Sequence, residues 1–228
     1  MRTWIPTLAL LLCTALPALA QHGHGQGSHN DAYVDPQLDV ERMIQRFENE
    51  SREVYALRHA IVAAAGIEPG MTVADVGAGT GAFLPDLTAA VGPQGHVFAC
   101  EVSIRFVEHL RQVADAAGWD NVTSVFSSFT SATLPDASCD RILVVDTYHH
   151  FDEPAPMLAS MLAALKPGGE MVVVDFDKKP GARAWIQDHL RADAATFRRE
   201  IEAAGFAFVE AVALEGMEEN FVHRYRRP

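Results

Sequence analysis

Residues 73–83 read VADVGAGTGAF, a run of apolar β-forming residues that contains one acid and leads into three glycines at alternate positions. The run at residues 73–76 predicts a buried strand. Gly77, Gly79 and Gly81 then allow a sharp turn and a close approach of the backbone to a ligand, because glycine has no Cβ. A helix that opens after such a turn points its free amide groups at whatever is bound there. The stretch therefore predicts a strand, a ligand-binding loop and a helix.

The glycine spacing and the acid before it narrow the class of ligand. Nicotinamide dinucleotides are bound by the spacing G-x-G-x-x-G, which brings a pyrophosphate against the helix N-terminus. This chain has G-x-G-x-G instead, preceded by Asp75. A carboxylate there repels a pyrophosphate and attracts a cation, so the pattern favours a positively charged ligand without phosphates and disfavours an NAD-dependent oxidoreductase.

From residue 70 onward, short β-rich runs alternate with amphipathic helical patterns. The predicted strands are residues 73–76, 96–100, 122–126, 141–145, 171–175, 206–213 and 220–225. The first five are nearly continuous apolar runs, as expected for a parallel sheet covered on both faces. The last two are joined only by the turn at 214–219, which predicts an antiparallel hairpin. We predict an α/β fold, a Rossmann-like doubly wound sheet of seven strands with an antiparallel C-terminal hairpin.

Helical patterns also precede and follow the strands. Asp35 and Pro36 predict a helix start, with an N-cap acid followed by proline. Apolar residues at helical spacing then continue to Gly66, so we assign residues 35–66 to an N-terminal helical cap over the edge of the domain or its pocket. One helical region is expected after the fifth strand, from about residue 182 to residue 204.

The N-terminal residues predict export. Residues 1–20 contain Arg2, an apolar run and the small-x-small sequence ALA at 18–20, as in a secretory signal peptide. The apolar run is short for a membrane span, so retention as an uncleaved anchor is the disfavoured alternative. Residues 21–34 form a leader rich in histidine and glycine that we expect to be disordered, either solvated or loosely capturing metal. We therefore expect a periplasmic or secreted domain at 35–228, with no stable membrane span after cleavage.

Charge and cysteine content exclude some partners. The chain of 228 residues has a formal net charge of −12, which argues against nucleic acid or an anionic membrane surface as the main partner. Cys100 ends the second predicted strand and Cys139 lies just before the fourth, so the two cysteines are at opposite ends of strands that we do not expect to be neighbours, and we expect no disulfide between them. Two separated cysteines also do not form a metalloid-binding cluster, and no metal site is predicted in the domain.

The glycine loop resembles the first motif of class I S-adenosylmethionine-dependent methyltransferases. Further segments resemble this family in the same order: LPD at 134–136, CD at 139–140, LKPGG at 165–169 and AAGF at 203–206. The resemblance covers about residues 60–228. It implies S-adenosylmethionine as cofactor, whose sulfonium and ammonium groups and lack of phosphate suit the acid before the loop.

The resemblance also implies which residues bind this cofactor. Glu101 closes the second predicted strand, roughly 20 residues beyond the loop, where an acid accepts hydrogen bonds from ribose hydroxyls. Many relatives have an aspartate near the adenine after strand three, but this chain reads FSSFT at 126–130, so Ser128 or a backbone group, with Phe129 stacking, has to replace it. The expected cofactor-binding residues are Asp75, Gly77, Ala78, Gly79, Gly81, Glu101, Val102, Ser128, Phe129 and Asp146. The alternatives are that Asp75 only caps the glycine turn, that Glu101 is a solvated surface acid, and that the three loop glycines serve only the packing of helix on sheet.

The fourth predicted strand ends in VDTYHHF at 145–151, the densest polar cluster of the chain. By the resemblance this segment faces the substrate, and histidine can act there as a general base. We predict His149, His150 and Tyr148 as catalytic residues, with His149 slightly favoured because two adjacent histidines are not expected to point inward together. The alternative is that the histidines cap a helix or satisfy backbone groups.

Several other polar and aromatic residues are assigned to structure. Asp175 and the segment DHLR at 188–191 are expected to be structural, with a reach over the pocket from the lid side as the alternative. Trp185 and Phe197 are expected to lie in the core, and the turn at 218–220 to be solvated. The predicted function is methyl transfer from S-adenosylmethionine to a small or lipid-like acceptor, as in the quinone-biosynthesis branch of the family, while a protein acceptor stays open. The alternative is a periplasmic protein that binds S-adenosylmethionine or a related nucleoside without turnover.

Overall fold

The structure is a computed structural model that describes Met1 and residues 30–228. The predicted signal peptide and residues 21–29 of the predicted leader therefore lie outside the described residues. The end of that leader is not detached from the domain: Asn30 is buried, and its side-chain amide donates to the carbonyl oxygen of His150 at 2.9 Å. No helix within the described part of the chain is long and apolar enough to cross a membrane.

Seven strands form one mixed sheet, in the order β3-β2-β1-β4-β5-β7-β6. Their bounds are β1 Thr72–Val76, β2 His96–Glu101, β3 Val122–Phe126, β4 Cys139–Val145, β5 Leu165–Phe176, β6 Ala207–Ala211 and β7 Asn220–Arg226. The first five pair in parallel, whereas β7 is antiparallel to both β5 and β6. The predicted doubly wound sheet with a C-terminal antiparallel hairpin is confirmed.

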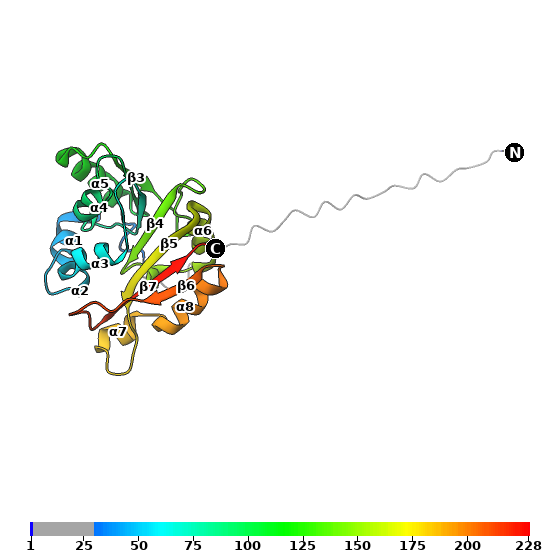
Figure 1. The fold of residues 1–228 in the computed structure, drawn as a ribbon. Helices are drawn as coiled ribbons and strands as arrows, with labels where there is room; N and C mark the ends of the chain where they lie inside the picture. Colours follow the sequence, from blue (N-terminus) through cyan, green and yellow to red (C-terminus); the bar gives the residue numbers. More distant parts are fainter. Residues whose placement is uncertain (2–29) are drawn as a thin grey trace.

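Helices cover both faces of the sheet (Figure 1). Their bounds are α1 Val40–Phe47, α2 Glu53–Ala56, α3 Arg58–Ala64, α4 Leu84–Val91, α5 Ile104–Ala117, α6 Pro154–Ala164, α7 Ala184–His189 and α8 Ala194–Ala203, with a short 3₁₀ turn η1 at Tyr148–His150. Buried residues of α2, α3, α4 and α5 pack on one face, and those of α6, α7 and α8 on the other. In Figure 1 the cap helices α1–α3 lie at the left of the sheet, and α7 and α8 lie below it.

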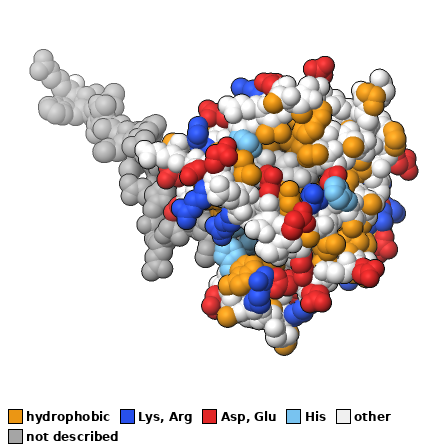
Figure 2. Space-filling view, turned by 90° about the vertical axis from the view of Figure 1, so that its left-hand side faces the viewer, with side chains coloured by type: hydrophobic (Ala, Val, Ile, Leu, Met, Phe, Trp, Pro, Cys, Tyr) orange, Lys and Arg blue, Asp and Glu red, His pale blue; other side chains and the backbone are white. Residues whose placement is uncertain are grey.

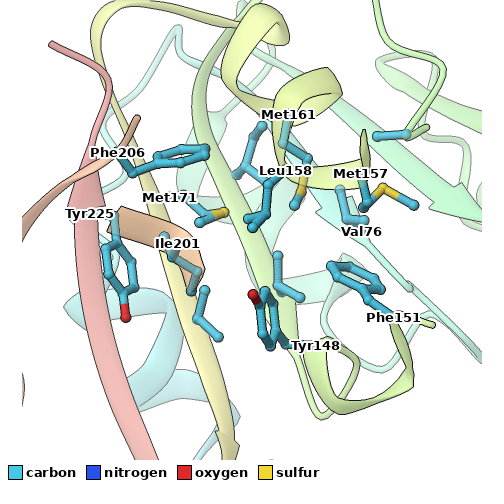
Figure 3. Close-up of a cluster of buried hydrophobic side chains, with 14 of the residues drawn as sticks. Val76, Tyr148, Phe151, Met157, Leu158, Met161, Met171, Ile201, Phe206 and Tyr225 are labelled. Atoms are coloured by element: carbon cyan, nitrogen blue, oxygen red, sulfur yellow. The ribbon is translucent and has the colours of Figure 1, made fainter. Parts of the chain in front are cut away.

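Alternate side chains of the central strands enter the two halves of the core. On β5, Met171 and Val173 join the cluster that contains α6 and α8, whereas Val172 and Val174 join the cluster under α4. All four are fully buried, and each such side chain stabilises the fold by about 1.5–3 kcal/mol relative to exposure. Figure 3 shows the first of these clusters, with Met171 among the labelled residues. Because both faces of this strand are covered, its sequence does not alternate between apolar and polar residues.

Several predicted boundaries differ from those of the structure. Helix α1 begins at Val40, not near Asp35, because the Asp39 carboxylate accepts a hydrogen bond from the Arg42 amide and caps it. The helical region expected at 182–204 is two helices, because Asp193 starts α8 separately as its N-cap. Strand β5 begins at Leu165, since pairing with β4 continues through the Gly-rich turn by a register shift.

Gly81 lies against buried side chains, whereas Gly118 has open space around it, so replacing each by alanine should affect stability differently. Its φ is +85°, and a Cβ there would lie 2.9 Å from Leu110 Cδ2. We expect Gly81→Ala to lower the free energy of unfolding by about 2–3 kcal/mol, because backbone strain and a core clash add. Gly118→Ala is the matched control, since Gly118 has a φ of +69° with no atom near its Cβ position. Urea denaturation should show a smaller loss for the control, and equal losses would contradict the packing role.

Candidate active site

A large cavity lies at the carboxyl ends of β1 and β4. These strands are neighbours, but the chain runs from β1 outward through β2 and β3 before it returns to β4. Ligands of doubly wound sheets bind at such a switch point. The cavity has a volume of about 450 Å³ and is lined by the glycine loop, the end of β4, the cap helices and α7. Figure 2 shows the cap side of the molecule, where acidic, basic and apolar side chains are interspersed.

The glycine loop forms the floor of this cavity. The amides of Gly77 and Ala78 donate to the carbonyl oxygen of Cys100, at 2.9 and 3.1 Å, which ties the loop to the end of β2. A Cβ on Gly77 would lie 2.3 Å from the Thr147 side chain, so the loop and the segment after β4 touch only because Gly77 has none. Gly79, in contrast, has open space above it, with Phe47 of the cap as the nearest side chain at 3.9 Å.

Asp75 is a buried carboxylate that lacks a complete set of partners. Only 2% of its surface is exposed, and its Oδ2 has no hydrogen-bond partner among the described residues. Burial, with a smaller effect of the Glu101 charge, raises the pKa of Asp75 to about 7. A buried polar atom without a partner is costly and rare in native proteins. Since Asp75 lines the cavity, its geometry fits a cationic or hydrogen-bond-donating ligand.

Glu101 joins the end of β2 to the glycine loop. Its Oε2 accepts from the Gly79 amide at 3.0 Å, and its Oε1 accepts from the amides of Val102 and Ser103 at 2.8 and 3.1 Å. Burial raises the pKa of Glu101, and these three amides oppose that rise. The carboxylate is thereby fixed at the cavity wall, and its oxygens keep lone pairs for donors such as hydroxyl groups.

The structure places most, not all, of the predicted cofactor-binding residues on the cavity. Those that line it are Asp75, Gly77, Ala78, Gly79, Glu101, Val102, Phe129 and Asp146. Gly81 does not line it, because it turns away to pack on Leu110. Ser128 does not line it either, since it forms an isolated bridge with Ser131 outside the cavity, and its neighbour Ser127 lines the wall instead.

Asp146 connects the end of β4 to the cap and to β7. Its Oδ2 accepts from Arg52 at 2.6 Å, and its Oδ1 accepts from the Asn220 side chain at 2.6 Å. Asp146 has a φ of +47°, a left-handed conformation that is strained for a non-glycine residue. Burial raises the pKa of Asp146 to about 6, and the Arg52 charge opposes this. The strained turn points the carboxylate at these two partners.

A second anchor holds the cap over the cavity. The Glu53 carboxylate on α2 accepts hydrogen bonds from the backbone amides of Glu218, Glu219 and Asn220, at 2.8–3.2 Å. The turn at 218–220 was predicted to be solvated, and this was wrong, because Asn220 is buried and Glu219 and Asn220 line the cavity. Arg52, Glu53 and Asn220 are functional-site residues that the sequence analysis missed, since no local motif links them.

His149 and His150 both line the cavity, contrary to the expectation that only one of them points inward. They lie on η1, where the tight turn stacks the two rings 4.1 Å apart at a tilt of 40°. His149 Nδ1 lies 2.7 Å from Oδ1 of Asp175, and its backbone amide donates to Oδ2 at 3.0 Å. Asp175 is fully buried, so this carboxylate orients the ring and is more than a structural residue.

Tyr148 was predicted to be catalytic, and the structure places it elsewhere. Its side chain is fully buried in the core beside α8, as Figure 3 shows, and it does not line the cavity. Its hydroxyl donates to Glu200 at 3.0 Å, and burial raises the pKa of Tyr148 far above its usual range. Trp185 is the opposite case: predicted as core, it is 41% exposed and lines the cavity next to Phe176.

Comparison with known proteins assigns the chain to one family. Residues 67–218 match the family described as methyltransferase domain. The chain belongs to the S-adenosylmethionine-dependent methyltransferases. A crystal structure of a methyltransferase of this kind from Aquifex aeolicus is similar with a TM-score of 0.73 and 25% identity, covering 83% of this chain and 99% of that one. The class I family predicted from the motifs is confirmed.

Curated methyltransferases match a shorter part of the chain. It is 29% identical over 140 residues to the ubiquinone/menaquinone biosynthesis C-methyltransferase UbiE of Shewanella piezotolerans, covering 61% of this chain and 51% of that protein. It is 31% identical over 121 residues to a protein-L-isoaspartate O-methyltransferase of Ignicoccus hospitalis, covering 53% and 54%. The chain thus spans about half the length of the curated relatives it matches.

The residues at the cavity fit the cofactor of this methyltransferase family. Oδ2 of the buried Asp75 carboxylate has no hydrogen-bond partner within the described part of the chain, which suits the ammonium or sulfonium group of S-adenosylmethionine. Glu101 stands at the end of β2 with oxygen lone pairs available to ribose hydroxyls. The open space over Gly79 lets a ligand lie directly on the backbone.

Proposed function

We propose that this protein transfers a methyl group from S-adenosylmethionine to a small or lipid-like acceptor. The observation that carries the proposal is the continuity of one cavity, which runs from Asp75 on the glycine loop to a wall of histidine and aromatic side chains. That wall includes Phe176 and Trp185, whose rings lie 4.8 Å apart. Aromatic rings on one wall of a cavity that also carries polar groups suit a small organic molecule. The similarity to proteins named as quinone-biosynthesis C-methyltransferases supports the same acceptor class.

The residues of the chain position the two reactants. When bound, S-adenosylmethionine supplies an electrophilic methyl group on a sulfonium, which an acceptor atom in line with the carbon–sulfur bond can take. Asp75 and Glu101 hold the charged and hydroxyl groups of the donor, and Phe47 covers the loop from the cap. The anchored cap excludes water and fixes orientation, which is the main contribution an enzyme makes to such a displacement.

His149 is the residue best placed to accept a proton from the acceptor. Asp175 binds Nδ1 and leaves Nε2 as the ring nitrogen available to the cavity. A base oriented by a buried carboxylate in this way acts as a general base, and typically contributes 10²–10⁴-fold in rate. The predicted base role of His149 therefore remains part of the proposed function, whereas Tyr148 is no longer a candidate.

The proposal is tested with methyl-labelled S-adenosylmethionine. The purified protein is incubated with the labelled donor and one of two acceptor fractions. The first is an organic-solvent extract of small molecules and lipids that includes quinone precursors, and the second is a protein fraction. Label should appear in the extracted small molecules and vanish with Asp75→Asn. Label in the protein fraction alone would contradict the acceptor class. Tight donor binding with no transfer to any fraction would replace the proposal by the alternative of a binding protein without turnover.

The affinity for the donor is expected to depend on pH through Asp75. The folded, ligand-free protein keeps the Asp75 proton up to about pH 7, whereas the unfolded chain releases it near the ordinary value of 3.8. Binding of a cation requires the charged form, so we expect the affinity to fall about tenfold per unit as the pH decreases from 7 toward 5. Calorimetric titration at pH 5–8 measures this, and Asp75→Asn should remove the slope.

The same pKa shift predicts the stability of the ligand-free protein. Because the pKa of Asp75 is raised in the folded state, the protonated carboxyl favours folding below pH 3.8, and this contribution is lost as the pH rises through about 7. The melting temperature of the ligand-free protein should therefore decline more steeply between pH 5 and pH 7 in the natural protein than in Asp75→Asn. Parallel pH profiles of the two proteins would contradict the assignment of the shift to Asp75.

We also propose that the protein acts after export, in the periplasm or medium, because residues 1–20 have the features of a signal peptide. The mass of the protein recovered from a cell fraction outside the cytoplasm should match a chain that begins at Gln21. A full-length mass, or recovery only from the cytoplasm, would contradict export.

A further inference from the structure

Three histidines come together at one end of the cavity. His149 and His150 lie on η1, and His189 ends α7. One ring nitrogen of each lies within 4.8 Å of those of the other two. The ring centroids of His189 lie 5.1 Å from His149 and 5.5 Å from His150. All three line the cavity.

The distances between these imidazoles suit a common metal ion. With zinc–nitrogen bonds of 2.0–2.1 Å, a tetrahedral site places its ligand nitrogens about 3.3 Å apart. The ring nitrogens lie within 4.8 Å of one another, at most about 1.5 Å farther apart than in such a site, and rotation about side-chain bonds can close that difference. Neutral imidazole is the form that binds zinc and similar divalent ions.

Asp175 provides the second observation that points to a metal. It is fully buried and lies 2.7 Å from His149 Nδ1, so Nδ1 carries the proton and Nε2 presents its lone pair. A histidine that donates its other nitrogen to a carboxylate is the usual arrangement around a protein-bound metal, where the carboxylate fixes the ring and raises its basicity. His149 is thus already oriented as a ligand before any ion binds.

The surroundings give the site a closed side and an open side. Phe176 lies 6.1 Å from the His149 ring and Trp185 lies 6.3 Å from the His189 ring, so aromatic groups flank the cluster. The other side faces the cavity that also reaches Asp75. Three protein ligands with one open position characterise catalytic zinc sites, whereas structural sites use four.

We propose that His149, His150 and His189 form a binding site for a divalent transition-metal ion of the zinc class, with Asp175 as the supporting carboxylate and an open position toward the cavity. The site goes beyond the proposed methyl transfer and does not depend on it. A cation there lowers the pKa of a coordinated hydroxyl, so an oxygen-bearing molecule is the class of ligand that the open position would take. No metal site in the domain was predicted from the sequence, because His189 is distant in sequence from His149.

The test measures metal binding directly, without donor or acceptor. The full chain is purified without a histidine tag and stripped with a chelator, and zinc affinity is determined by competition with a chromophoric chelator. Because the leader contains His22, His24 and His29, a second protein has these three replaced by asparagine. In that leader variant we expect one zinc ion per chain with a Kd of roughly 1 µM or tighter. When Co²⁺ is bound in place of zinc, it should give a visible absorption band with the intensity typical of a four-coordinate ion.

Single replacements in the leader variant then assign the ligands. His189→Ala is expected to weaken zinc binding by about 100-fold or more, and Asp175→Asn by about 10–100-fold, as for supporting carboxylates of other sites. His109→Ala on α5, which does not line the cavity, is the matched control and should leave the affinity unchanged. Thermal melting confirms that each variant folds. Loss of all binding in the leader variant, or equal affinity with and without His189, would overturn the proposal and leave adventitious binding only.

Discussion

Replacing Asp175 by asparagine is expected to slow methyl transfer by about 10²–10⁴-fold while the affinity for S-adenosylmethionine stays within about twofold. Asp175 contacts the backbone and ring of His149 and does not itself line the cavity. An amide in its place can present its NH₂ group to Nδ1, which moves the imidazole proton to Nε2 and blocks that nitrogen. The effect holds whether Nε2 accepts a proton directly or binds a metal ion. Steady-state kinetics and donor titration measure the two quantities separately.

Two controls separate this role from a general loss of structure. Asp177→Asn removes an equal charge two positions later, where the half-buried side chain does not line the cavity, and should leave the rate unchanged. His149→Gln should lower the rate as much as Asp175→Asn does. If Asp175 acts through His149, the double variant is no slower than His149→Gln alone, because effects within one unit are not additive. Additive losses would contradict the positioning role.

The parts of the molecule that were predicted from the sequence are those that local patterns encode. The glycine loop combines an apolar strand, an acid and three glycines within a short segment, so Asp75, Gly77 and Gly79 were found at the cavity. The hairpin was predicted because β6 and β7 are joined by too short a connection for a parallel crossover. The strands of a parallel sheet that is covered on both faces have continuous apolar sequences, so each strand can be predicted without knowing which strands pair with it.

The parts that were not predicted depend on contacts between distant segments. Arg52 and Asn220 both bind Asp146, although one precedes the sheet and the other begins its last strand. The position of Tyr148 was not predicted for a different reason. The backbone of the single turn η1 directs the Tyr148 ring into the core and the His149 side chain into the cavity. Spacing alone did not reveal that direction, since η1 follows neither a strand nor an α-helical period.

Replacing Asp75 by asparagine is expected to weaken S-adenosylmethionine binding by about 100-fold at pH 8, which corresponds to roughly 2.7 kcal/mol. At that pH most Asp75 side chains are charged, because the pKa is about 7. The buried Oδ2 has no hydrogen-bond partner among the described residues, so the bound cation is its main source of stabilisation. An asparagine of the same size keeps the shape of the site, removes the charge and replaces one carboxylate oxygen by an NH₂ group.

The outcome at lower pH and in a control variant makes this prediction specific. Below pH 6 the natural protein should lose most of its advantage over Asp75→Asn, because its own carboxyl is then protonated. Asp86→Asn removes an acid from the first turn of α4, outside the cavity, and should bind the donor as the natural protein does. If Asp75→Asn binds S-adenosylmethionine as tightly as the natural protein at pH 8, the carboxylate does not contact the cationic part of the donor. The glycine loop would then hold the ligand through its backbone alone.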